Sequence, residues 1–291
     1  MSLSILTNTS AMQTEISLNN SSNAVSNAMQ DLSSGLRINS AADDAAGYAI
    51  SQGLTTQVNG LQQASQNVSD ATSMVQTADS ALNNIQSMLQ QISELGVEYQ
   101  NGDLSTSDQQ DIQDEVNQLT QEIDRQTGSV TFNGINLLNG TAGNGGAVTF
   151  QVGPAGTDTL AVSFANIEGT NGLSTSVGFS WGASSVNATS GGVVFSLGQA
   201  NAVSLITAAI NNISSMAATL GAVQNRLQYT SNEISVTQEN MSSSLGSIQD
   251  VDMASEMTTL TQQQVLQQAG TAMLSQAQSQ PQLVLKLIQN G

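Results

Sequence analysis

The longest regular hydrophobic pattern lies between residues 44 and 100, a stretch without proline. Apolar residues recur there every seven positions, in two rows that are three positions apart. The rows are Leu61, Val68, Val75, Leu82, Leu89 and Ala64, Ala71, Ala78, Ile85, Ile92. Two such rows over about five heptads indicate the seam of a coiled coil. At about 1.5 Å per residue the helix would span roughly 80 Å, which predicts a rod.

A second heptad pattern follows Gly198 and predicts another long helix. Its row is Ile206, Ile213, Leu220, Leu227, Ile234, Met241 and Ile248. Between the two patterns, residues 100–108 break the first helix, and a shorter helical pattern runs from Ile112 to about Gly128 with Asp108 as its expected N-cap. Because the long helices flank an insert, we expect them to fold back on each other as an antiparallel pair.

The segment from Thr131 to about Gly198 is β-leaning. Residues 148–152 and 159–164 read as two strands joined by a turn at 153–158. The Ser/Gly-rich stretch 170–192 is either short surface strands or a loop, and the pattern does not separate these.

Both chain ends have helical periodicity with little apolar bulk. Leu18, Val25 and Leu32 continue a sevenfold row among polar residues, and Met257, Leu260, Val265 and Leu266 give one apolar face to a Gln-rich helix. Isolated helices of this kind are marginal in water. We therefore expect the ends to be unfolded in the monomer and to order only against copies of the same protein.

Charge narrows the range of possible functions. The 291 residues include 22 acidic and four basic residues, a net charge of -18, although only 9% of residues are charged against about 25% in ordinary proteins. So few bases exclude nucleic-acid partners and adhesion to anionic lipid. No uninterrupted apolar run reaches the roughly 18 residues of a membrane helix, so we expect no membrane insertion. The N-terminus has no signal-peptide pattern, which by itself favours the cytoplasm.

The sequence also lacks cysteine and histidine. Thiolate chemistry, the usual acid–base residue and the commonest metal ligands are therefore missing. A hydrolase can still use two carboxylates, but the composition predicts no enzyme activity, no cofactor and no metal. Binding and assembly become the leading functions.

Two long motifs stand out, DLSSGLRINSAADDAAGYAI (31–50) and VLQQAGTAMLSQAQ (265–278), and a third, EIDRQTGSVTFNGINLLNG (122–140), supports them. All three resemble bacterial flagellin, the subunit of the flagellar filament. The resemblance covers about residues 1–165 and 200–291. It implies an inner-tube coiled coil, an outer-tube layer of long helices with a β-hairpin, and a small variable insert. These map to 1–42 with 248–291, to 43–165 with 199–247, and to 166–198.

The expected fold is therefore mainly α: a long antiparallel coiled-coil bundle with a β-hairpin and a small β-rich insert, its termini helical in the filament. The resemblance implies a helical homopolymer for swimming motility, secreted unfolded through the flagellar type III export apparatus to an extracellular filament. Implied partners are copies of itself, the cap and hook-junction proteins, and an export chaperone. The nearest alternative is the hook–filament junction protein. A flagellin-like enzyme and a cytoplasmic coiled-coil scaffold are alternatives from other classes.

Three groups of residues are expected to matter. Subunit contacts are assigned to Leu18, Val25, Leu32, Met257, Leu260, Val265 and Leu266. Asp43 and Asp44 read as helix N-terminal charges, neutralised by Arg37, at the junction of the layers; a cation site or an acid–base pair is the less favoured interpretation. Gln91, Leu95 and Glu115 match the positions by which family members are recognised by a Toll-like receptor, but glutamine replaces the family's usual arginine, so we expect weak recognition.

Two further expectations concern the surroundings of the filament. Near pH 3 most carboxylates would be protonated, leaving an almost neutral polymer, so we hypothesise an acidic external medium. The insert could carry O-linked sugars, and Asn187 lies in an Asn-Ala-Thr sequon, but an undecorated loop is the favoured interpretation.

Overall fold

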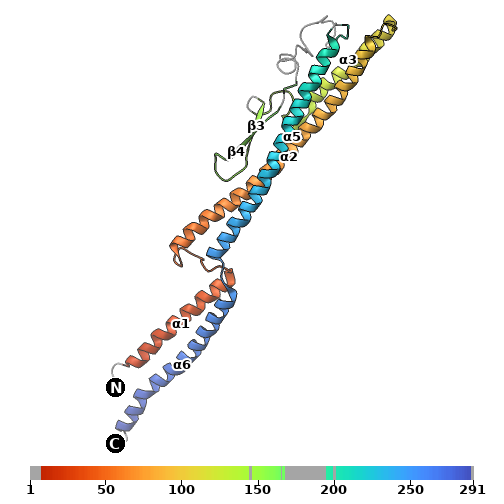
Figure 1. The fold of residues 1–291 in the computed structure, drawn as a ribbon. Helices are drawn as coiled ribbons and strands as arrows, with labels where there is room; N and C mark the ends of the chain where they lie inside the picture. The colour runs from red at the N-terminus through yellow and green to blue at the C-terminus, as the bar shows by residue number, and fades with distance from the viewer. Residues whose placement is uncertain (1–7, 144–145, 165, 168–194, 199–200, 290–291) are drawn as a thin grey trace. The chain divides into compact units, whose positions relative to one another are not determined.

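The computed structural model describes residues 8–143, 146–164, 166–167, 195–198 and 201–289, with side chains up to Ser279. Most of these residues are helical (Figure 1). The helices are α1 (Thr9–Ser34), α2 (Ala45–Tyr99), α3 (Thr106–Ser129), α5 (Ala202–Gln249) and α6 (Met253–Gln289). The strands are β1 (Thr131–Phe132), β2 (Ile135–Asn136), β3 (Ala147–Gln151) and β4 (Thr159–Ser163). The mainly α fold expected from the sequence is confirmed.

The protein forms two compact units. Unit 1 contains Met1–Val58 and Glu239–Gly291, and unit 2 contains Asn59–Gln238. Each of α2 and α5 contributes residues to both units, because each crosses a unit boundary in the sequence. The sequence analysis placed the boundaries between the inner and outer layers after residues 42 and 247, which differ from these unit boundaries. The layers concern the assembled filament and stay a prediction.

The core of unit 2 is built from the two heptad rows of α2. All ten residues of that seam are buried, and seven of them are fully shielded from solvent: Ala71, Val75, Ala78, Leu82, Ile85, Leu89 and Ile92. The row of α5 from Ile206 to Ile234 is buried as well. At Gly96 the two helices come close, since a Cβ there would lie 3.4 Å from Ile206 Cδ1. The predicted helical core is confirmed.

α3 begins one turn earlier than expected. Ser105 is its N-cap, and its hydroxyl accepts the N–H of Asp108 at 3.2 Å. The Asp108 carboxylate in turn accepts the Ser105 N–H at 3.1 Å, which completes a capping box. The prediction of Asp108 as the N-cap is therefore wrong: it occupies the third helical position. The buried apolar face of α3 includes Ile112, Val116 and Ile123.

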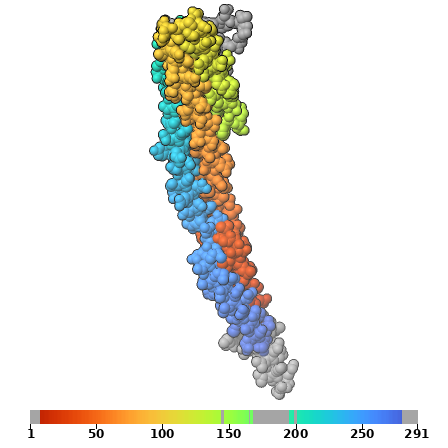
Figure 2. Space-filling view, turned by 90° about the vertical axis from the view of Figure 1, so that its right-hand side faces the viewer, coloured from red at the N-terminus to blue at the C-terminus, as the bar shows by residue number. Residues whose placement is uncertain are grey.

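Two antiparallel hairpins follow α3. β3 pairs with β4 from Ala147↔Ser163 to Gln151↔Thr159, which confirms the predicted strands to within a residue. The turn of this hairpin packs on α2 (Figure 2), where a Cβ at Gly60 would lie 2.9 Å from Pro154 Cβ. β1 and β2 form a smaller hairpin around Asn133 and Gly134 that the sequence analysis did not predict.

Both ends of the predicted insert, residues 166–198, are bonded to the rest of unit 2. Before it, the N–H of buried Ile167 donates to the carbonyl of Leu138 at 2.8 Å. After it, the Gln113 side chain accepts the N–H of Leu197 at 2.8 Å and donates to the carbonyl of Phe195. The stretch 170–192, with its sequon at Asn187, lies outside the described residues, so its predicted conformation is not addressed.

Within the described residues, one helix, α5, is long and apolar enough by length and composition to cross a membrane. The sequence analysis asked for an uninterrupted apolar run, which α5 lacks, so the expectation of no membrane insertion stays a prediction. Core helices pass the same test, and α5 contributes Ile206, Ala209 and Ile213 to the core of unit 2.

Candidate assembly surface

The two chain ends form a helix pair in unit 1. α1 and α6 lie side by side and antiparallel (Figure 1), since the start of α1 meets the later part of α6. There the Asn8 side chain is both the N-cap of α1 and a donor to the carbonyl of Ala277, at 2.8 Å. Halfway along, Leu18 packs against Gly270, where a Cβ would lie 3.4 Å from Leu18 Cδ1.

This helix pair buries very little of itself. Ala28 is the one buried residue among the 26 of α1, and none of the described α6 side chains, residues 253–279, is buried. Both helices are rich in Gln, Asn, Ser and Thr, so their mutual contact contains few large apolar side chains. α1 and α6 therefore form an antiparallel helix pair without a filled core.

The predicted assembly residues fall into two groups. Leu18, Val25, Leu32 and Leu260 are half-buried in the helix pair. The others face solvent: Met257 is 51% exposed, Val265 59% and Leu266 47%. The three exposed residues line a groove of about 480 Å³ on the surface of α6, together with Thr258, Thr261 and Gln262. In the structure the first group packs between α1 and α6, and the second group stays exposed on α6, where another protein surface could contact it.

On α1 the exposed apolar surface is larger than the sequence analysis indicated. Met12, Ile16 and Met29 of α1 are each more than half exposed, and so is Met273 of α6. The analysis followed the sevenfold row that contains Leu18 and missed Met12 and Ile16, which stand four residues apart on another face. Their i, i+4 spacing was the signal that could have identified them.

The motif at residues 31–50 builds the junction between α1 and α2. Gly35 ends α1 in the left-handed conformation, with φ +74°, and its carbonyl accepts the N–H of Val251 at 3.0 Å. Leu36 forms an antiparallel bridge with Asp250. Ile38, 1% exposed, is buried beside this crossing. The motif thus joins the two halves of the sequence next to their terminal helices.

Arg37 has a role that differs from the predicted one. Its guanidinium donates to the carbonyl of Ile248 at 2.6 Å, and its backbone N–H donates to the carbonyl of Gln249 at 2.7 Å. It therefore satisfies the last carbonyls of α5. In the part of the protein that the structure describes, the one ion pair joins Arg125 to Glu122, so the prediction that Arg37 neutralises Asp43 and Asp44 is not supported.

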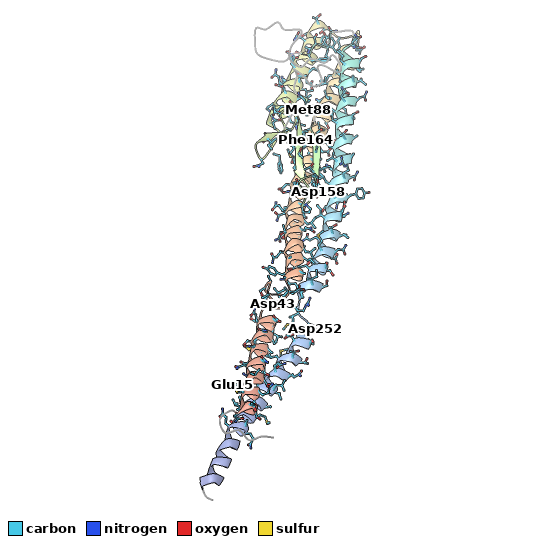
Figure 3. All side chains as sticks on the ribbon, turned by 90° about the vertical axis from the view of Figure 1, so that its left-hand side faces the viewer. Glu15, Asp43, Met88, Asp158, Phe164 and Asp252 are labelled. Carbon is cyan, nitrogen blue, oxygen red and sulfur yellow. The ribbon has the colours of Figure 1, made fainter. Side chains whose placement is uncertain are left out.

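Asp43 and Asp44 each accept backbone hydrogen bonds at the start of α2. Asp44 Oδ1 accepts the N–H groups of Ala46 and Gly47, both at 3.0 Å, and so caps the helix. Asp43, labelled in Figure 3, accepts the Ser40 N–H at 2.9 Å. Hydrogen bonds from the backbone and then the hydroxyl of Ser40 lower the pKa of Asp43. These contacts support the interpretation of both carboxylates as helix-terminal groups.

The three receptor-motif positions come together in unit 2. Gln91 on α2 donates through Nε2 to Glu115 Oε1 on α3 at 3.1 Å. Both side chains are exposed, and Leu95, one turn further along α2, is half-buried. Glu115 is thus held by a neutral amide at the position where an arginine would supply a charged, two-pronged donor.

Carboxylates dominate the electrostatics of the described surface. Glu122 is paired with Arg125, which lowers the pKa of Glu122 through a side-chain hydrogen bond, and the Ser105 hydroxyl lowers the pKa of Asp108. Among the described residues no group of three or more acidic side chains has the arrangement of a metal site.

Comparison with known proteins gives matches over almost the whole sequence. The model of the bacterial flagellin N-terminal helical region matches residues 5–143, and that of the C-terminal helical region matches residues 203–288. The protein is 39% identical to the flagellin of Bacillus subtilis strain 168, over 97% of its own length and 98% of the relative's. It is 38% identical to the flagellar filament 33 kDa core protein of Treponema phagedenis, with the same coverage. The crystal structure of Bacillus cereus flagellin matches 58% of this protein and 88% of its own length, at 26% identity and a TM-score of 0.45.

Proposed function

The protein belongs to the bacterial flagellin family, and from this premise we propose that its copies join through the exposed apolar faces of α1 and α6. Flagellins are structural proteins of the flagellar filament, so the protein is a filament subunit that polymerises with itself and lies outside the cell. Relatives that match over 97% of the sequence are named flagellins and filament core proteins, which favours this role over the hook–filament junction protein.

The proposal rests on how few residues are buried in the long helices at the chain ends. α1 has 26 residues, of which one is buried, while Met257, Val265 and Leu266 remain about half exposed. Fixing a residue's backbone costs about 1–2 kcal/mol of conformational entropy, which a pair with so small a core does not offset. Neighbouring copies that cover the exposed faces supply the missing burial, so folding of the ends and polymerisation become one event.

The placement of the exposed residues sets the kind of contact. The groove around Val265 is lined by α6 alone, and we assign the exposed Met12 and Ile16 of α1 in the next subunit as its counterpart. Contacts between unlike faces build a helical polymer when their repetition does not close into a ring. Half-buried Leu18 and Leu260 then keep the two ends of each subunit together within that polymer.

The remaining partners follow from the same assembly. We propose that the protein is secreted through the flagellar type III export apparatus after delivery by an export chaperone, and that it adds to the filament between the hook-junction proteins and the cap. Chain ends that are unfolded before assembly suit this route, because their apolar residues stay accessible to a chaperone. The lack of cysteine suits it too, since no disulfide obstructs a threaded polypeptide.

Recognition by the innate-immune receptor is proposed to be weak. Glu115 is engaged by Gln91 and presents no adjacent arginine at that position. A cell-reporter assay of the purified protein should give a response below that of an agonist flagellin, and Gln91→Arg should raise it. An equal response from the unmodified protein would overturn this part of the proposal.

The assembly proposal is tested by two matched substitutions in the full-length protein. Val265→Ser on α6 and Val236→Ser on α5 remove the same side chain from positions that are 59% and 58% exposed. Burying a valine contributes about 1.5–3 kcal/mol, and 1.4 kcal/mol is about tenfold in an equilibrium constant. Val265→Ser should therefore raise the critical concentration for seeded polymerisation about tenfold.

The control variant should polymerise like the unmodified protein, and both variants should leave the thermal unfolding of the monomer unchanged. Sedimentation measures the polymer, and electron microscopy verifies that it is a helical tube. Equal effects of the two substitutions, or no effect of Val265→Ser, would contradict the assignment of the contact to α6.

A further inference from the structure

Asparagine precedes glycine seven times in the sequence. Four of these pairs lie wholly within described residues: Asn59–Gly60, Asn101–Gly102, Asn133–Gly134 and Asn139–Gly140. In this dipeptide the glycine nitrogen reaches the Cγ of the asparagine readily, since glycine has no Cβ to hinder the approach. The four pairs share this local chemistry and differ in their surroundings.

Asn59 is protected by helix. It lies in the interior of α2, where the N–H of Gly60 belongs to the helical hydrogen-bond ladder. Gly60 is also packed against Pro154 of the β3–β4 turn, because a Cβ there would lie 2.9 Å from Pro154 Cβ. Attack by the Gly60 nitrogen therefore requires opening of a long, well-packed helix.

Asn139 is protected by its own hydrogen bonds. Its Oδ1 accepts the N–H of Thr141 at 3.0 Å and the hydroxyl of the same residue. Gly140 is crowded by Asn166, whose Nδ2 would lie 2.5 Å from a Cβ there. The side chain and the glycine are thus both held in place.

Asn101 is exposed, just beyond the end of α2. Glu98 and Asp103 flank it, and its backbone N–H is bonded to the carbonyl of Glu98 at 2.9 Å. The attacking Gly102 nitrogen must lose its proton, and nearby carboxylates oppose the formation of a second negative charge. This pair is accessible but electrostatically disfavoured.

Asn133 has none of these protections. It and Gly134 are the two loop residues of the β1–β2 hairpin, with φ +49° and +79°, as a type I′ turn requires. Both are exposed, and nothing lies within 4 Å of a Cβ at Gly134. No acidic residue occurs between positions 125 and 157. The flanking strands have two residues each, so the turn opens at small cost.

We propose that Asn133 is a site of spontaneous covalent modification, at which the side-chain amide converts to the carboxylate of aspartate or isoaspartate faster than at the other three pairs. The Gly134 nitrogen loses its proton and bonds to Asn133 Cγ, and the bond from Cγ to Nδ2 breaks as ammonia leaves. Water then opens either C–N bond of the resulting cyclic imide. No co-reactant other than water is needed, and the reaction is independent of the assembly proposed above.

The product alters the hairpin in two ways. Both products add a negative charge to a protein that already has 22 acidic residues. Isoaspartate also inserts an extra carbon into the backbone of a two-residue loop, whose length fixes the pairing of Phe132 with Ile135. Leu137 and Leu138, fully buried just beyond β2, connect this loop directly to the core of unit 2.

The test is to incubate the purified full-length protein at pH 8 and at pH 5 and to follow each asparagine by peptide mass spectrometry. Isoaspartate is measured separately with a protein isoaspartyl methyltransferase. At pH 8 the order of conversion should be Asn133 first, then Asn101, Asn139 and Asn59, with little change at pH 5. In guanidinium chloride the four rates should converge, because unfolding removes the structural protection of Asn59 and Asn139 and the salt screens the carboxylates beside Asn101.

Asn133→Gly keeps a turn-compatible sequence and should abolish the methyltransferase signal from this hairpin, leaving conversion at Asn101 unchanged. The matched control, Asn101→Gly, should leave conversion at Asn133 intact. Faster conversion of any other described pair in the folded protein, or the same spread of rates in denaturant, would overturn the proposal.

Discussion

The central helices and the terminal helices share a sevenfold pattern but differ in what the pattern buries. In α2 the row from Leu61 to Leu89 is at most 4% exposed, because aliphatic residues also fill the second row from Ala64 to Ile92. In α1 the row that contains Leu18 has polar companions, and only Ala28 is buried. Periodicity therefore determines where a helix forms, and the bulk of the second row determines whether the helix is stable without a partner.

The comparison is tested most severely by removing equal side chains from the two regions. Leu82→Ala removes a side chain with no solvent exposure from unit 2, and Leu266→Ala removes one that is 47% exposed from α6. The first should lower the free energy of unfolding of the monomer by about 2–5 kcal/mol. The second should change it by less than about 0.5 kcal/mol. Urea unfolding, followed by circular dichroism, measures both.

A reversed order, with Leu266→Ala the more damaging variant in the monomer, would show that the terminal pair is folded and stable before assembly. In that case the proposal that the chain ends fold only on assembly would be wrong, while the assignment to the flagellin family would be unaffected.

Two glycines at the start of α2 sharpen the comparison within unit 1. A Cβ at Gly47 would lie 2.5 Å from Asp44 Oδ2 and 2.7 Å from Ile38 Cδ1, whereas a Cβ at Gly53 would meet nothing within 4 Å. Gly47→Ala should destabilise the junction by about 1–3 kcal/mol through overpacking. Gly53→Ala should instead stabilise the helix by about 0.5–1 kcal/mol.

Thermal unfolding of the two glycine variants gives the sign of each change. If Gly47→Ala were as well tolerated as Gly53→Ala, the close packing of Ile38 and Asp44 against Gly47 would not be maintained in solution.

The capping box of α3 offers a smaller test in unit 2. Ser105→Ala removes the hydroxyl that accepts the Asp108 N–H, and loss of such a cap costs about 1 kcal/mol. Ser105→Asp retains an acceptor and should preserve most of the stability. Hydrogen exchange at the first turn of α3 should rise in the first variant alone, and protection of that turn in both would refute the assigned cap.

Acid is expected to act in opposite directions on local contacts and on assembly. The lowered pKa values of Asp43 and Asp108 mean that their hydrogen bonds stabilise the fold above about pH 4. This stabilisation is lost as the pH falls through their pKa values in the folded protein. Protonation of the 22 acidic residues also removes repulsion between copies that have only four bases each.

The hypothesis of an acidic medium requires the second effect to be the larger one in the filament. Filaments should then resist dissociation at pH 3 at least as well as at pH 7, and added salt at pH 7 should imitate acid by screening. Light scattering on preformed filaments measures both. Readier dissociation at pH 3 would contradict the hypothesis.

Much of the fold could be predicted because its determinants are local and periodic. The heptad rows of α2 and α5 and the strands on either side of residues 153–158 require only side-chain spacing. The N-cap was misplaced because Ser105 and Asp108 are both capping residues, and spacing alone does not rank them. The β1–β2 hairpin was missed although Asn133–Gly134 is a strong turn signal, since its strands are too short to show alternation.

Long-range contacts of the candidate site were beyond the reach of the sequence. Arg37 donates to a carbonyl 211 positions away. Because every residue has a backbone carbonyl, the residue types do not reveal which carbonyl accepts the hydrogen bond. Charge alone therefore suggested the nearby Asp43 and Asp44 as its partners. The exposed residues of α1 were missed for a different reason, because a single row was followed on a helix whose apolar residues occupy more than one face.

The most direct measurement is hydrogen exchange of α1 and α6 in the monomer and in the assembled filament, with α2 as the internal reference. In the monomer, amides of residues 9–34 and 253–289 should exchange almost as fast as those of an unfolded peptide, while those around Leu82 and Ile85 stay protected. In the filament all three helices should be protected. Equal protection of α1, α6 and α2 in the monomer would contradict the claim that the chain ends fold only when copies cover them.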